Sequence, residues 1–167
     1  MYEVIYFSRG GNTKKLATAI ADELNVKSRH IRTVTSLPEG ADIFLGSGLY
    51  FLRPAKPIRD FIQNNDFRGR NIALFGTSTT GVGLEIMGME RLLKRKGAII
   101  TGKYYCPGRF FLRIAGKLLF IRKGRPADKD LEKAREFAHS IGNKLYSTRV
   151  VTESEEEKYE DRILSRV

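Results

Sequence analysis

The feature that most constrains this chain is a repeated order: a short apolar segment, a turn of small polar residues, and then a segment with helical spacing. Apolar runs typical of strands occupy residues 2–7, 29–34, 42–45, 71–75 and 98–105. Helical spacing or helix boundary signals mark residues 12–24, 57–64, 84–96 and 128–146. Strands that alternate with helices in this way predict a mainly parallel sheet with helices on both faces.

The length and composition suit one domain. There are 167 residues, and 41% of them are hydrophobic, which is enough to bury a core. We expect a domain over residues 1–147, followed by a polar acidic tail over residues 148–167 that is disordered or forms a loose helix. No apolar run is long enough to cross a bilayer and no signal-peptide pattern opens the chain, so we expect a cytoplasmic protein. A single cysteine and two distant histidines do not support a metal site.

The segment SRGGNTKK, residues 8–15, leads from the first predicted strand into the first predicted helix. Its glycines allow backbone N–H groups to approach an anion closely. Ser8 and Thr13 supply hydroxyl groups, Asn12 supplies an amide, and the helix start supplies unpaired N–H groups at the positive end of its dipole. This set of donors predicts a phosphate site, although its spacing matches neither the P-loop nor the dinucleotide fingerprint. The simpler alternative is a tight turn capped by Asn12 or Thr13.

Two further polar turns follow predicted strands. Residues 46–48 (GSG) follow the run 42–45, and residues 76–81 (GTSTTG) follow the run 71–75. In doubly wound sheets, ligands bind beyond the carboxyl ends of the strands. The three turns would meet at that edge, and this convergence predicts a ligand site.

The first turn, Ser8-Arg9-Gly10-Gly11-Asn12-Thr13, resembles the S/T-x-T-G-N-T/S phosphate loop of the flavodoxins, which bind FMN. Residues 45–50 and 76–83 fall where that family places its second and third flavin loops. The resemblance covers about residues 1–147. It implies an α/β fold of three layers, with a doubly wound, parallel, five-stranded sheet of order 2-1-3-4-5. It also implies one non-covalent FMN and electron transfer through that flavin.

By position, the resemblance implies that the first loop holds the phosphate and that the other two loops line the two sides of the flavin ring. The implied cofactor-binding residues are Ser8, Arg9, Gly10, Gly11, Asn12, Thr13, Ser47, Gly48, Leu49, Tyr50, Thr77, Ser78, Thr79, Thr80, Gly81 and Gly83. The resemblance implies no catalytic residue.

Two departures from the family pattern bear on function. Gly10 stands where flavodoxins usually have Thr, so Arg9 or an added backbone N–H would replace a lost hydroxyl contact. The third loop, TSTTGVG, has no aromatic residue, so Tyr50 or Phe51 would stack on one face of the ring and leave the other open or covered by an aliphatic side chain. An open face suits substrate access, as in flavin reductases and quinone-linked oxidases. The chain is therefore either an electron carrier or a small FMN-dependent oxidoreductase.

The charge of the chain predicts an acidic partner. The formal net charge is +11 and the pI is near 9.9, whereas typical flavodoxins are acidic. Residues 108–125 (GRFFLRIAGKLLFIRKGR) form a loop or short helix in this prediction, and a helix would align Arg109, Arg113 and Lys117 beside an apolar face. That segment would face solvent, an acidic redox partner or an anionic membrane surface.

Part of the same segment resembles the basic, aromatic insert of the flavodoxin-like, menaquinone-dependent protoporphyrinogen oxidases. That resemblance implies the alternative function, a membrane-proximal FMN-dependent oxidoreductase with a quinone partner. Charge alone would also suit a nucleic acid, but the chain has no nucleic-acid-binding motif and we expect no such partner.

Overall fold

The computed structural model describes residues 1–79, 81–114, 117–121 and 124–164. Its main sheet contains five parallel strands in the order β2-β1-β3-β5-β6. These strands are β1 (Tyr2–Phe7), β2 (Ser28–His30), β3 (Asp42–Tyr50), β5 (Asn71–Ser78) and β6 (Ile99–Pro107). A two-residue strand, β4 (Arg53–Pro54), pairs antiparallel with the end of β3. Counted along the chain, the parallel strands have the order 2-1-3-4-5, which confirms the predicted fold class.

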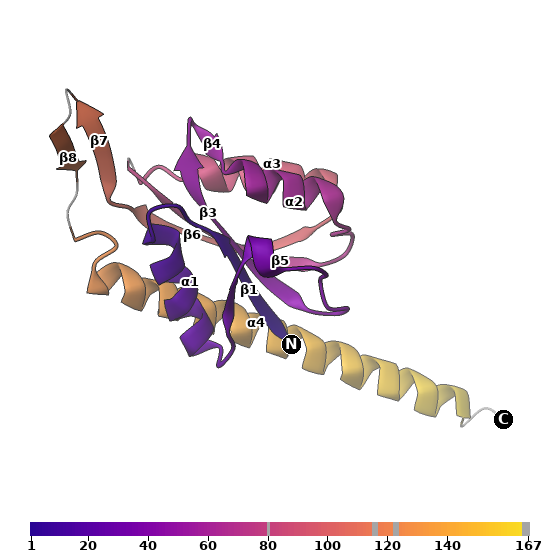
Figure 1. Ribbon diagram of the computed structural model, residues 1–167. Helices are drawn as coiled ribbons and strands as arrows, with labels where there is room; N and C mark the ends of the chain where they lie inside the picture. Colours follow the sequence, from indigo (N-terminus) through magenta and orange to yellow (C-terminus); the bar gives the residue numbers. More distant parts are fainter. Residues whose placement is uncertain (80, 115–116, 122–123, 165–167) are drawn as a thin grey trace.

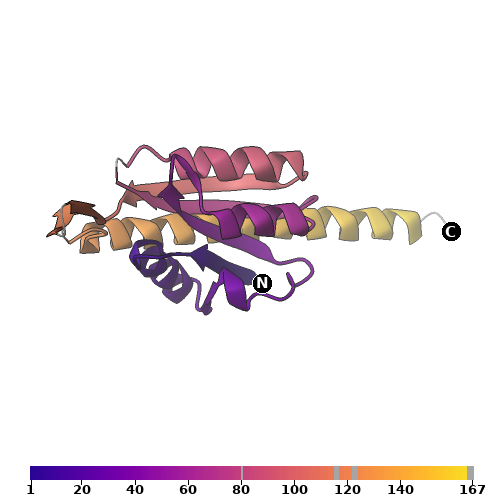
Figure 2. The same cartoon turned by 45° about the horizontal axis from the view of Figure 1, so that its top comes forward.

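Helices cover both faces of the sheet (Figures 1 and 2). Helices α1 (Asn12–Glu23) and α4 (Asp128–Leu164) pack on one face, and α2 (Lys56–Asn64) and α3 (Leu84–Arg95) pack on the other. A short 3₁₀ helix, η1 (Ile31–Thr33), follows β2. This arrangement gives the three layers expected for a doubly wound sheet. Within the described residues, no helix is long and apolar enough to cross a membrane.

Strand β1 shows why the sheet sits in the middle of the molecule. Val4 and Tyr6 pack with the helices α1 and α4, whereas Ile5 and Phe7 pack with the opposite core. All four side chains are buried, as expected for a central parallel strand covered on both faces. Full burial of each aliphatic or aromatic side chain contributes roughly 1.5–3 kcal/mol.

The strands extend further toward the predicted site than the sequence indicated. The strand that begins with residues 42–45 was predicted to end at the turn of residues 46–48, but β3 continues to Tyr50 because it pairs with β1, β5 and β4 along its length. Gly46 is needed inside it, since a Cβ atom there would lie 2.1 Å from the Phe75 ring. The weak strand predicted over residues 29–34 is shorter, and the chain turns into η1 after His30.

The prediction of a loop or short helix over residues 108–125 was wrong. Strands β7 (Phe110–Ile114) and β8 (Lys117–Ile121) form a separate antiparallel hairpin at one end of the molecule (Figure 1). The spacing of the cations suggested a helix, but Phe, Leu and Ile at nearly every position suit strands equally well, and the pairing of two such segments decides between them.

Helix α4 is longer than predicted. It continues past residue 146 to Leu164 and extends well beyond the sheet, at the end opposite the hairpin (Figures 1 and 2). Residues 143–164 contain neither Gly nor Pro, so no local signal stops the helix. Arg149 forms an ion pair with buried Asp42 at the start of β3, which ties the first part of this extension to the sheet.

Candidate functional site

A cavity of about 440 Å³ lies at the carboxyl ends of β1, β3 and β5. The turn after β1, the end of β3 with the turn toward β4, and the end of β5 each contribute to it, together with the residues that follow β6. The lining residues are Ser8, Arg9, Gly10, Asn12, Thr13, Gly48, Leu49, Tyr50, Phe51, Thr77, Ser78, Thr79, Gly108 and Arg109. The three polar turns of the sequence therefore do meet at one edge of the sheet.

The turn between β1 and α1 leaves open space above a helix start. A Cβ atom on Gly10 or Gly11 would meet no heavy atom within 4 Å. Gly11 is the N-cap of α1 with a φ of 81°, a left-handed conformation that favours glycine, and it offers no side chain to cap the first N–H groups. Donors at the positive end of a helix dipole, next to an unfilled turn, are suited to hold an oxyanion.

Hydrogen bonds fix three loops against one another along one wall of the cavity. The Oγ1 atoms of Thr13 and Thr77 lie 2.9 Å apart, and both residues are buried. One hydroxyl of such a pair donates to the other, so the second keeps its hydrogen for another acceptor. Asn12 Nδ2 donates to the carbonyl oxygen of Arg109 at 2.6 Å, and Gly108 N–H donates to the carbonyl oxygen of Ser78 at 2.8 Å.

Tyr50 connects the second loop to the first. Its hydroxyl accepts a hydrogen bond from the backbone N–H of Arg9 at 3.0 Å. The guanidinium carbon of Arg9 lies 5.0 Å from the centroid of the Tyr50 ring, within the range of a cation–π contact. The ring also meets Phe7 edge-on, with the centroids 5.9 Å apart. These contacts hold an aromatic ring at the wall of the cavity.

Most of the residues implied by the sequence line the cavity, and a few lie beside it. Ser47 is fully buried, and its Oγ donates to the carbonyl of Gly48 at 2.8 Å and accepts from the N–H of Ala55 at 3.0 Å, which braces the turn before α2. Gly11, Gly81 and Gly83 lie in the loops but not in the lining, and Thr80 lies outside the described residues. A cofactor contact stays a prediction for all of these residues.

Phe51, Gly108 and Arg109 line the cavity, although none of them belongs to the set of residues implied by the sequence. The sequence does contain a signal for Gly108 and Arg109. The strand predicted over residues 98–105 runs parallel to the others, so the residues that follow it must lie at the same edge of the sheet. Gly108 also approaches Asn12 closely: a Cβ atom on it would lie 3.0 Å from Asn12 Nδ2.

The comparisons with known proteins agree with this fold. The family described as a flavodoxin domain matches residues 3–98 of the chain. The chain is also 34% identical over 135 residues to the uncharacterized protein MJ0298 of Methanocaldococcus jannaschii, a match that covers 78% of this chain and 89% of that protein. The chain belongs to the flavodoxin family.

Solved structures share the fold of this family member. A flavodoxin from the domain Archaea superposes with a TM-score of 0.67 at 20% identity, covering 87% of this chain and 98% of the other. Oxidised flavodoxin 1 from Bacillus cereus gives a TM-score of 0.60 at 20% identity, covering 85% and 97% of the two chains. The flavodiiron core of Flv1 from Synechocystis gives 0.66 at 18% identity, with 88% of this chain but 36% of that chain covered.

In this flavodoxin-family protein, the first turn of α3 buries an acid directly after the third loop. Glu85 is 0% exposed, and neither carboxyl oxygen has a hydrogen-bond partner in another described residue. Burial disfavours the ionised form and raises the pKa of Glu85 to about 7. Burial, with the nearby charge of Asp130, also raises the pKa of Cys106 to about 12, so its thiol is protonated and inert.

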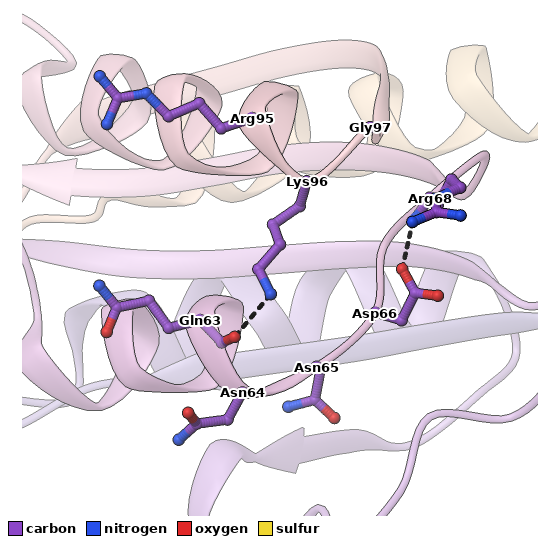
Figure 3. Close-up of a pocket in the computed structure, with 8 residues that line it drawn as sticks. All are labelled: Gln63, Asn64, Asn65, Asp66, Arg68, Arg95, Lys96 and Gly97. Carbon is purple, nitrogen blue, oxygen red and sulfur yellow. Dashed lines mark hydrogen bonds between the residues drawn. The ribbon is translucent and has the colours of Figure 1, made fainter.

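A larger hollow of about 580 Å³ lies at the opposite edge of the sheet, where α2 and α3 end (Figure 3). Its polar groups bond to one another: Lys96 Nζ donates to the carbonyl of Gln63 at 2.7 Å, and Arg68 N–H donates to Asp66 Oδ1 at 3.0 Å. Cations at the carboxyl ends of helices complement the helix dipoles. The helix ends therefore account for the charged and polar groups in this hollow without a ligand. The hollow lies at the edge of the sheet opposite the predicted site.

Proposed function

We propose that this protein binds FMN in the cavity at the carboxyl ends of β1, β3 and β5 and acts as an electron carrier. The observation that carries the proposal is the unfilled glycine turn, Gly10 and Gly11, at the start of α1 and at the edge of a cavity of suitable size. Membership of the flavodoxin family supports it. FMN, when bound, supplies the ability to accept and release one or two electrons.

The residues of the cavity fit the two ends of FMN. The N–H groups of the first loop other than that of Arg9, the Ser8 hydroxyl and the free hydrogen of the Thr13–Thr77 pair would hold the phosphate. The Tyr50 ring offers a flat apolar surface for the flavin ring. The net charge of +11 attracts the phosphate dianion.

A titration of FMN with the purified protein tests the proposal, with binding measured by the quenching of flavin fluorescence. Gly10→Asp places a carboxylate in the open space without requiring a left-handed backbone at that position. We expect it to weaken FMN binding roughly 10- to 100-fold by charge repulsion. Riboflavin, which lacks the phosphate, should bind both proteins alike.

The matched control is Gln63→Glu, which adds the same charge in the hollow at the opposite edge of the sheet (Figure 3). It should leave FMN binding unchanged. A wild-type protein that takes up no FMN would refute the proposal. If Gly10→Asp weakened riboflavin and FMN binding equally, the phosphate of FMN could not be assigned to the glycine turn.

A second candidate function is that of a small FMN-dependent oxidoreductase with a quinone as its acceptor. The third loop favours it: its described lining residues, Thr77 to Thr79, carry no ring, and Val82 is 58% exposed. This side of the cavity therefore has no aromatic cover from that loop. Rapid mixing of the reduced protein with a water-soluble quinone distinguishes the two functions. A rate that saturates with quinone concentration indicates an enzyme, and a rate that stays linear indicates a carrier.

A further inference from the structure

A second hollow, of about 380 Å³, adjoins the proposed flavin cavity and gathers arginines. It shares Arg9 and two aromatic residues with the cavity, and it extends to β4 and the first turn of α2. Its lining residues are Arg9, Tyr50, Phe51, Arg53, Pro54, Lys56 and Arg59. We call it the arginine hollow.

The arginine hollow has an excess of positive charge. Lys56 pairs with Asp60 at 2.6 Å, but in the part of the chain that the structure describes, Arg9, Arg53 and Arg59 have no carboxylate partner. Like charges gathered around one hollow repel one another, and an anion between them would relieve that repulsion. The planar guanidinium group also matches the geometry of carboxylate and phosphate oxygens better than an ammonium group does.

The guanidinium of Arg59 is partly buried without full compensation from the protein. Its Nε is buried, and no described residue accepts a hydrogen bond from it. A buried donor without a partner is unfavourable in a folded protein, because the water it bonded to in the unfolded chain has not been replaced. Arg59 also lines the hollow, so an oxyanion there would compensate its positive charge at close range, where burial makes that charge costly.

The rim between the two hollows is strained and apolar. Phe51 and Leu52, in the turn between β3 and β4, have φ values of 50° and 61°, a left-handed conformation that is unfavourable for residues other than glycine. Phe51 is 95% exposed and Leu52 is 74% exposed. The turn thus holds an aromatic side chain in solvent beside both the cavity and the arginines.

We propose that the arginine hollow binds the carboxylate or phosphate group of a small-molecule substrate, whose apolar part packs on Phe51 at the edge of the cavity. A concave site of this size fits a small anion better than the flat acidic surface of a protein partner. The role of this molecule as a substrate rests on the second candidate function, the FMN-dependent oxidoreductase, whereas binding of the anion rests only on the lining of the hollow.

Calorimetric titration of the flavin-free, full-length protein with citrate and with pyrophosphate tests this proposal, at constant ionic strength. We expect saturable binding at one site, and the tighter of the two probes tells whether the natural group is a carboxylate or a phosphate. Arg53→Gln/Arg59→Gln should weaken that binding at least about tenfold. Arg68→Gln/Arg95→Gln, which removes the same charge from the hollow in Figure 3, should change it less than about twofold.

Several outcomes would overturn the anion site. One is the absence of saturable binding of either probe, and another is an equal loss in both double variants, which would show that only the net charge matters.

The FMN affinity of Arg53→Gln/Arg59→Gln should equal that of the wild type, and a parallel loss would assign these arginines to the phosphate of FMN. If the double variant does not fold by circular dichroism, the exposed single substitution Arg53→Gln carries the same test. If the protein bound a probe but took up no FMN, the result would support the anion site and refute the proposal that the protein binds FMN.

Discussion

Replacing Glu85 by glutamine tests whether the acid buried at the start of α3 is held neutral. Glutamine keeps the shape of the side chain but cannot ionise. Burial raises the pKa of Glu85 from 4.5 to about 7, and no other described residue bonds to its carboxyl oxygens. At about 1.36 kcal/mol per pH unit, that difference corresponds to roughly 3 kcal/mol of folding free energy.

The sign of the effect follows from which state ionises first. The folded pKa lies above the unfolded one, so as the pH rises the unfolded chain loses this proton before the folded protein does. The stability contributed by the neutral carboxyl is complete below pH 4.5, falls as the pH rises from there to about 7, and is lost above it. Glu85→Gln escapes this loss. Its free energy of unfolding, relative to the wild type, should therefore rise by roughly 2–3 kcal/mol between pH 5 and pH 8.

Urea unfolding followed by far-UV circular dichroism at several pH values measures this difference. The matched control is Glu132→Gln, which makes the same change at an exposed position of α4. Its stability relative to the wild type should vary by less than about 0.5 kcal/mol over the same range, as expected for an exposed ion pair. Parallel pH profiles for Glu85→Gln and the wild type would refute the reasoning, because they would mean that Glu85 ionises as easily in the folded protein as in the unfolded chain.

Further predictions address the cavity, the long helix and the hairpin. Tyr50→Ala should weaken riboflavin binding roughly tenfold in fluorescence titrations because the flavin ring loses its aromatic contact, and FMN binding at least as much because the Tyr50 hydroxyl also holds the Arg9 N–H of the first loop; unchanged riboflavin binding would contradict this. Arg149→Ala should lower the free energy of unfolding by about 1–2 kcal/mol, less than for a fully buried pair because Arg149 is partly exposed, and an unchanged urea midpoint would show that its bond to Asp42 contributes nothing. We expect the basic segment of residues 109–126, which includes the hairpin of β7 and β8, to bind anionic lipid, because it contains six cations and no acid, and of these Arg125 pairs with Asp130. Arg113→Gln/Lys117→Gln should then lower co-sedimentation with phosphatidylglycerol vesicles roughly tenfold or more, and equal binding to purely zwitterionic vesicles would argue against a role for the charge.

The alternation of the five parallel strands with four helices, the covering of the sheet on both faces and the edge at which a site would form could all be inferred from the sequence. These features follow from local physics. Val4 to Phe7 are apolar at every position, which suits only a strand buried on both faces, and the turn at Gly10 and Gly11 leads directly from that strand into a helix. The meeting of the polar turns then follows from the parallel direction of the strands, without knowledge of any long-range contact.

What surrounds that edge depends on contacts between residues that are far apart in the sequence. Asn12 meets Arg109 across 97 positions of the chain, and no local pattern announces such a contact. The hairpin of β7 and β8 depended on the pairing of two segments whose composition suits more than one conformation. Burial of Glu85, and with it a pKa near neutrality, depends on how α3 packs against Gly76. The arginine hollow likewise exists only because β4 and α2 fold back beside the first loop, and charge becomes specific only when folding brings it to one place.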